Sequence, residues 1–292
     1  MTATTTLPLA VPRPRWRRAA RALRRHPMLY AGGAILLALA VIALAAPWLA
    51  SADPLDINPL ARMKPPSTEH LFGTDALGRD VYSRTLWGAR ISLVVGVVVA
   101  LVSTAGGVVL GMLAGYFRRL DGVIMRIMDG LMAIPGVLLA IALMATLKGG
   151  LGTVIVAIVV PEVPRVVRLV RALVLTIREQ PYIEAAVAAG TRVPAILLRH
   201  ILPNLFAPLM VQATFIAASA ILTEAVLSFL GVGIPPQIPS WGNIMAEGRN
   251  FVAVAFHIIL YPGLFLGVAV LAVNLVGDGL RDMLDPRLAK KL

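Results

Sequence analysis

Few residues of this chain have types and spacings that could carry chemistry. No glycine-rich loop ends in Gly-Lys-Ser or Gly-Lys-Thr, which removes the usual phosphate cradle of nucleotide hydrolysis. There is no cysteine, so thiolate metal sites, disulfides and cysteine nucleophiles are excluded. The serines and acids give no sign of a catalytic triad, and the four histidines lack metal-ligand spacing. We therefore expect no catalytic residue, no metal site and no cofactor bound by this chain itself.

One polar and basic segment stands between strongly apolar runs. Its alanines would let a short helix seat closely against a partner, and its acid and arginines would supply polar contacts. Gly190 would permit a backbone turn after the first helix. We expect a soluble partner to grip this segment; a plain amphipathic interface helix is the alternative. The residues assigned to docking are Glu184, Ala185, Ala186, Gly190, Arg192, Arg199 and Pro203.

The composition indicates the class of protein to which this segment belongs. Of the 292 residues, 58% are hydrophobic and 14% are charged, and the mean hydropathy is +0.83. A soluble domain carries about 25% charged residues. The chain is therefore predicted to be an all-α polytopic membrane protein. Its net charge of +12 is interpreted as positive-inside topology, because the basic residues flank apolar runs, and we expect no nucleic-acid partner.

The first half of the chain divides by charge and hydropathy. Residues 1–27 form a basic tail, expected in the cytoplasm, and 28–50 the first span. A signal peptide is the alternative, but the apolar run is too long for one. Residues 51–90, with mixed charges, are an external loop. The second span is 91–116, and its glycines at a spacing of four predict tight helix packing: Gly107, Gly111 and Gly115.

The next part contains the least regular spans. Residues 117–126 are expected as an internal loop and 127–147 as the third span, kinked at Pro135. The apolar run 151–160 is short, but if it did not cross, the basic stretch that follows would lie outside. We therefore expect it to cross, with Glu162 reaching the inner headgroups. Three arginines are interpreted as topology anchors, with contact to the partner of the docking segment (an ATPase, if the resemblance described below holds) as the alternative: Arg165, Arg168 and Arg171.

The last part completes six spans with both termini cytoplasmic. The fifth span is expected at about 205–230, followed by an external loop at 231–250 and the sixth span at 251–276. The core domain is placed at 91–280, with a coupling loop at 176–204 and a cytoplasmic tail at 281–292.

Two further polar groups invite a function. Glu224 lies inside a span, and such acids face a cavity or a partner. It is a candidate for the translocation pathway, and an interhelical acid with hydrogen-bonded partners is the equal alternative. Asp75, Arg79 and Asp80 cluster in the external loop, where they would contact a soluble binding protein or pair with one another.

These motifs resemble a known family. The docking segment is similar to the EAA motif of ABC importer permeases. It contains Glu-Ala-Ala at 184–186, a glycine after three further residues, and then Ile201-Leu202-Pro203. The run from His70 to Asp80, with Gly88-Ala89-Arg90, resembles peptide and nickel permeases, most of all the second ("C") permease of dipeptide and oligopeptide importers. The stretches 227–233, 239–242 and 274–287 resemble the last external loop and the C-terminus of that branch.

The resemblance implies a type I ABC importer permease in the bacterial plasma (inner) membrane. Such a permease would import di- or oligopeptides, with nickel or another small solute as the alternative cargo. It implies a homologous second permease, one or two ATPase subunits that bind ATP and Mg²⁺, a substrate-binding protein outside and lipid around the spans. In that family the EAA motif forms a short cytoplasmic helix that docks on the ATPase. An ion-coupled secondary transporter and a membrane scaffold are the alternatives from other classes.

Overall fold

The computed structural model describes residues 26–147 and 149–284, and these form helices with no strand beyond one isolated bridge between Thr74 and Asp80. The all-α class is confirmed. The long helices are α2 (Pro27–Leu49), α3 (Val81–Tyr116), α4 (Arg118–Met132), α6 (Leu151–Arg178), α9 (Leu202–Phe229) and α11 (His257–Leu284). The short elements are η1 (Pro59–Ala61), α5 (Gly136–Thr146), α7 (Pro181–Ala188), α8 (Val193–Ala195), the π-helical turn η2 (Ile196–Ile201), α10 (Trp241–Gly248) and η3 (Arg249–Phe251).

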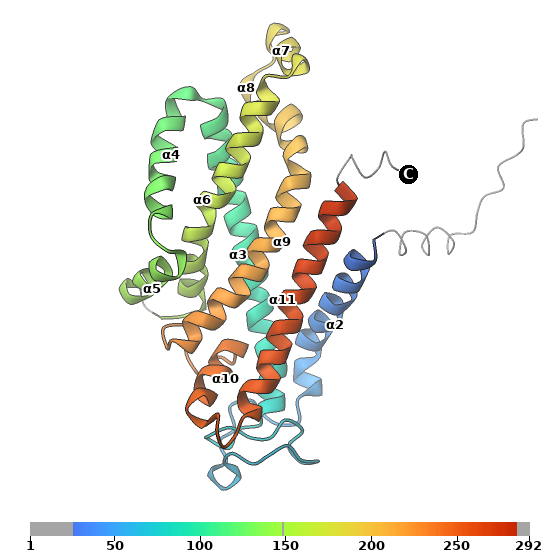
Figure 1. The fold of residues 1–292 in the computed structure, drawn as a ribbon, viewed down its shortest axis with the longest axis vertical. Coiled ribbons are helices and arrows are strands. Elements are labelled where there is room, and N and C mark those ends of the chain that lie inside the picture. The colour runs from blue at the N-terminus through green and yellow to red at the C-terminus, as the bar shows by residue number, and fades with distance from the viewer. Residues whose placement is uncertain (1–25, 148, 285–292) are drawn as a thin grey trace, which may run out of the picture.

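The bundle has two unlike ends (Figure 1). At one end lies α7, and the start of α2 and the end of α11 point toward this end without reaching it. At the other end lie α10 and the irregular segment between α2 and α3. Most of the two expected tails, 1–27 and 281–292, lies outside the described residues, which begin at residue 26 and end at residue 284.

The number of spans can be compared with the expected six. Among the described residues, four helices are long and apolar enough to cross a membrane: α2, α3, the stretch Val193–Phe229 that contains α9, and α11. The bent pair of α4 and α5 makes a fifth if it is one span. The expected fourth span lies within α6, which runs unbroken through Pro161 and Pro164 but carries Glu162 and several arginines.

The expected third span is divided. Instead of one kinked helix over 127–147, α4 and α5 meet at an angle of 90° around Pro135. Pro135 cannot continue the ladder of α4, and it disfavours helical backbone at the residue before it. Residues 118–126, expected as a loop, form the first half of α4. The sequence located the break but underestimated its angle.

Close packing of α3 on α6 supports the centre of the bundle. Three glycines of α3 face three valines of α6, in the pairs Gly107–Val166, Gly111–Val170 and Gly115–Val174. A Cβ atom added to each glycine would lie 2.3, 2.6 and 2.7 Å, respectively, from the Cβ atom of its valine. The glycines thus let the two backbones approach, as the spacing of four predicted. Both helices contribute to the main buried cluster, together with α9.

Helix bounds differ from the expected spans mainly at the α10 end. α3 begins at Val81, ten residues before the expected second span, because the Asp80 carboxylate accepts a hydrogen bond from the Ser83 amide at 2.8 Å and caps the helix. The expected loop 231–250 contains α10, and α11 starts at His257 instead of 251. The expected first and fifth spans agree with α2 and α9 within a few residues.

Candidate coupling site

The docking segment forms α7, a short helix at the tip of the bundle. α7 is joined to the end of α6 by only two residues, Glu179 and Gln180, and Pro181 occupies its first turn, where a missing amide costs nothing. Ile183 is only 2% exposed and belongs to the main core cluster. The helix is therefore fixed to the bundle through one buried apolar side chain.

Gly190 ends α7 with a left-handed residue. Its φ is +75°, its amide donates to the Val187 carbonyl at 2.9 Å, and the Thr191 amide donates to the Ala186 carbonyl at 3.0 Å. This is a Schellman cap. A Cβ atom at position 190 would meet nothing within 4 Å. The glycine is thus required by the backbone conformation and not by crowding.

The return from α7 to α9 is also held firmly. Ile196 and Ile201, in the π-helical turn η2, are 1% and 0% exposed and pack in the same cluster as Ile183. The Asn204 side chain donates to the His200 carbonyl at 2.6 Å and to the Tyr182 hydroxyl at 3.4 Å. α7 is therefore connected by packing and hydrogen bonds to both α6 and α9. The expected loop 176–204 includes the last turn of α6 and the first turn of α9.

The outer side of this segment is open. Of the residues assigned to docking, all are exposed except Ala186, which is half-buried. Three apolar side chains that sequence reasoning missed lie exposed in the same segment: Tyr182 at 45%, Val187 at 54% and Leu198 at 60%. Apolar anchors among charged groups are typical of a protein interface. We call the coupling surface the set Tyr182, Glu184, Ala185, Val187, Gly190, Arg192, Leu198, Arg199 and Pro203.

Glu224 is enclosed by the chain itself. Its side chain is in α9 and has no exposed area. Its carboxylate accepts hydrogen bonds from Ser228 at 2.9 Å, from Ser240 at 2.8 Å and from Ser92 at 3.4 Å. This placement differs from the expected exposure to the pathway, and it matches the alternative of an interhelical acid. The three serines come from α9, the start of α10 and α3, so Glu224 ties these elements together.

The external acids and arginines are likewise buried. Asp75, Arg79 and Asp80 are 1%, 6% and 3% exposed, which removes them from the expected contact with a binding protein. The Asp75 carboxylate accepts from Arg79 at 2.7 Å and from Arg84 at 2.6 Å. Both arginines also donate to Glu247 in α10.

We call Asp75, Arg79, Arg84 and Glu247 the external ion cluster. Sequence reasoning missed Arg84 and Glu247 because 163 residues separate them. The only hint was that both lie in stretches that were expected to be external. Asp80 belongs to a neighbouring group, where it accepts from Ser51 at 3.0 Å and lies 3.2 Å from His70.

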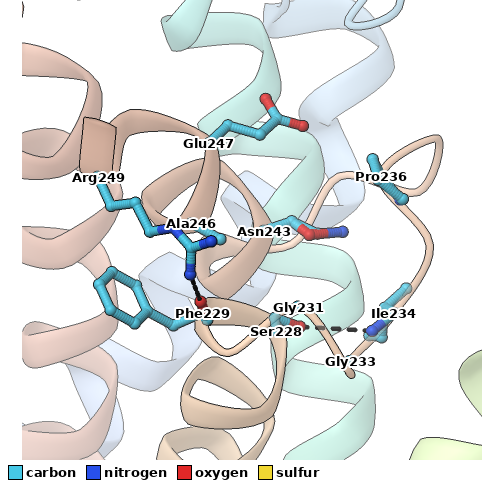
Figure 2. Close-up of a pocket in the computed structure, with 10 residues that line it drawn as sticks. All are labelled: Ser228, Phe229, Gly231, Gly233, Ile234, Pro236, Asn243, Ala246, Glu247 and Arg249. Carbon is cyan, nitrogen blue, oxygen red and sulfur yellow. Dashed lines mark hydrogen bonds between the residues drawn. The ribbon is translucent and has the colours of Figure 1, made fainter. Parts of the chain in front are cut away.

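Beside Glu247 a cavity of about 190 Å³ opens between the end of α9 and α10 (Figure 2). The Arg249 guanidinium at its rim donates to the Phe229 carbonyl at 2.8 Å and lies over the Phe229 ring. Because that cation is already partnered, we assign no ligand to the cavity. Among the described residues no group of three or more histidines, aspartates or glutamates could hold a metal ion.

Comparison with known proteins identifies this architecture. Residues 107–290 match the family described as binding-protein-dependent transport system inner membrane component, and residues 14–66 match the N-terminal transmembrane domain of oligopeptide transport permease C. A probable peptide ABC transporter permease protein of Sinorhizobium fredii is 53% identical and covers 98% of each chain. A dipeptide transport system permease protein of Alkalihalophilus pseudofirmus is 42% identical over 94% of this chain and 90% of its own.

The fold is found in a solved structure as well. A chain of the MetNI methionine ABC transporter, in inward-facing conformations, matches with a TM-score of 0.53 over 68% of this chain and 93% of its own, at 19% identity. At that identity the likeness concerns the fold alone. The family match and the curated relatives carry the assignment: this chain belongs to the inner membrane components of binding-protein-dependent transport systems.

Proposed function

We propose that this chain is a permease subunit of an ATP-driven importer for di- and oligopeptides. The names of its relatives support the cargo class. A homologous second permease would complete the pathway, and a soluble binding protein would deliver peptide from outside. One or two ATPase subunits would bind ATP and Mg²⁺, and this chain would perform no hydrolysis.

The single observation that carries the proposal is the coupling surface. It is exposed, yet α7 is attached to α6 and α9 through Ile183, Ile196 and Ile201, which are buried. A helix that only rested on lipid headgroups would not need such an attachment. An ATPase bound there could bias the permease between two states, provided that its contacts differ between those states.

Charge supports a cytoplasmic position for this end. Arginines outnumber acids at the α7 end of the bundle: Arg118, Arg119 and Arg126 against Asp121 near the start of α4, and Arg178, Arg192 and Arg199 against Glu179 and Glu184 around α7. The opposite end mixes both signs, as in the external ion cluster. By the positive-inside rule the α7 end faces the cytoplasm, with both termini on that side.

The proposal is tested with the complete importer in proteoliposomes. ATP-dependent uptake of a labelled dipeptide is expected only when binding protein and ATPase are both present. Because the chain has no cysteine, Val187→Cys introduces a single thiol into the coupling surface, and its crosslinking to the ATPase is expected to follow the nucleotide state. Thr153→Cys, in α6 and far from the coupling surface, is the matched control.

Two results would overturn the proposal. Uptake driven by an ion gradient without ATPase subunits would make the chain a secondary transporter. Uptake of nickel or another small solute, with no uptake of peptide, would refute the peptide cargo, although the ATP-driven mechanism would still hold.

A further inference from the structure

A charged group lies half-way along the bundle, away from both clusters described above. The Arg165 guanidinium in α6 donates through Nη1 to both oxygens of Glu162, at 3.0 and 3.2 Å. The Ser219 hydroxyl in α9 donates to the same carboxylate at 3.1 Å. Glu162 is 7% exposed in its side chain, whereas Arg165 is 54% exposed. The acid is enclosed and the cation faces outward.

The depth of this group follows from its neighbours. Val166, next to Arg165, packs on Gly107, which lies near the middle of the apolar part of α3. Ser219 lies near the middle of α9. At 1.5 Å per residue, Arg165 is about 14 Å from the level of Tyr116, where α3 ends. That distance is longer than an arginine side chain, so the guanidinium cannot reach the level at which α3 ends.

A polar stripe connects this depth with the α7 end. Arg171 donates to Asp121 at 2.6 Å, and Arg168 donates to Asp129 at 2.6 Å. Both acids belong to α4. Arg168 and Asp129 are about half exposed, at 46% and 54%. The stripe of α4 and α6 thus descends from the α7 end to Arg165, where sequence reasoning expected topology anchors or, as the alternative, contact with an ATPase.

Charged side chains at mid-depth are costly against hydrocarbon, and they face a water-filled cavity or a protein partner. In Arg165 only Nη1 donates to a carboxylate among the described residues, so other guanidinium N–H groups are left for a ligand. The flanking side chains on the same face of α9, Phe215 and Leu222, are apolar and 40% and 43% exposed. The face therefore combines one available cation with apolar walls.

Resting on the proposed function, we propose that Glu162, Arg165 and Ser219 form a peptide-binding station half-way along the pathway, where Arg165 receives the terminal carboxylate of the cargo. Every linear peptide with a free C-terminus carries this group whatever its side chains. Glu162 holds the guanidinium in place and lowers the cost of keeping its charge within the membrane. Recognition of the carboxylate alone suits a permease that must pass many different peptides.

The test uses the complete importer in lipid nanodiscs without nucleotide. Ser219→Cys gives the chain its only thiol, which is expected to react with a charged, membrane-impermeant thiol reagent. Tri-alanine is expected to slow the reaction. Tri-alanine amide, which lacks the carboxylate, is expected to need at least about a tenfold higher concentration for equal protection, since hydrogen bonds to charged groups are of that strength.

Two variants complete the design. In Thr214→Cys the thiol lies on α9 but lines an apolar groove shared with α2, α3 and α11, and it is expected to stay unreactive. The double substitution Arg165→Gln and Glu162→Gln leaves no buried charge unpaired, so it is expected to assemble. In the Ser219→Cys background it is expected to abolish the difference between the two peptides.

Absence of reaction at position 219, equal reaction at 214, equal protection by both peptides, or a difference that persists in the double variant would each overturn the station. ATP-driven uptake by the unsubstituted complex is measured in parallel. If tri-alanine does not protect the thiol at position 219 while the unsubstituted complex takes up peptide normally, this inference alone is refuted. If the unsubstituted complex takes up no peptide, the proposed function is refuted.

Discussion

The two ends of the molecule use the same residue types in opposite ways. The coupling surface presents Glu184, Arg192 and Arg199 to solvent. The external ion cluster encloses Asp75, Arg79 and Arg84, and only its Glu247 is partly exposed, at 24% of its side chain. Both groups stood out in the sequence as polar clusters beside apolar spans. The difference is that α10 covers one cluster and supplies Glu247, whereas nothing in the described part of the chain covers the other.

This difference teaches which charges hold the chain together and which are left for partners. A buried, multiply paired charge is costly to disturb, because removing one member leaves another desolvated. An exposed charge contributes little to folding, so its substitution reports on docking. The comparison therefore predicts that stability and coupling can be damaged separately.

The largest effect is expected for Arg84→Met. It leaves the buried Asp75 with Arg79 as its only cationic partner and removes one of the two arginines that donate to Glu247, and breaking a buried pair costs about 3–5 kcal/mol. The thermal unfolding of the purified subunit in detergent measures the loss. Arg192→Met on the coupling surface is the control and should lie within about 0.5 kcal/mol of the natural protein. Equal losses in the two variants would contradict the comparison.

An intermediate effect is expected for Gly190→Ala. The alanine must adopt φ of +75°, which costs about 1–2 kcal/mol, but its Cβ atom meets no neighbour. We expect the strain to loosen the end of α7, so that peptide-stimulated ATP hydrolysis falls while membrane insertion is unchanged. Gly190→Asn should retain more activity, since asparagine tolerates this conformation. Identical activities of the two variants would argue against a conformational cause.

The smallest effect on stability is expected for Glu184→Lys. The side chain is exposed, so the free energy of unfolding should change by less than about 0.5 kcal/mol. Co-purification of the ATPase and ATP-dependent uptake should nevertheless fall strongly, because the charge at the docking face is reversed. Normal transport and assembly in this variant would remove the main support for the coupling surface.

Salt offers a comparison without substitution. Attraction between exposed charges is screened beyond about 8 Å at physiological ionic strength, and buried pairs are screened much less. Raising the salt concentration should therefore weaken ATPase association, measured by co-sedimentation, before it lowers the unfolding temperature of the subunit. A simultaneous decline of both would indicate that the external ion cluster is open to solvent.

The sequence predicted the helical class, most helix positions and the short helix of the polar segment, α7, because these depend on local patterns. Hydropathy located α2, α9 and α11, and the spacing of Gly107, Gly111 and Gly115 predicted their close packing. It could not predict that Pro135 turns the chain by 90°, since that angle depends on what α5 packs against.

The partners of the buried charges also escaped prediction. The three serines around Glu224 come from separate elements, and Glu247 reaches Arg84 only after α9 and α10 have folded back. From the sequence alone, Asp75 and Glu184 were both candidates for contact with another protein. They differ because α10 covers the cluster of Asp75 and leaves Glu184 exposed, and the position of α10 is a property of tertiary packing.

The glycine–valine contact between α3 and α6 has a mechanical consequence. Each valine side chain of α6 occupies the space that a Cβ atom on the facing glycine of α3 would need. Neither helix can therefore slide along the other unless the two helices first move apart. The pair must therefore tilt as one unit, and α3 within it is long and apolar enough to cross the membrane. With 36 residues, α3 is about 54 Å long, and a rotation of about 10° around its midpoint would carry each end through about 5 Å. A small movement of the cytoplasmic end of α3 would thus produce a movement of similar size and opposite direction at its external end.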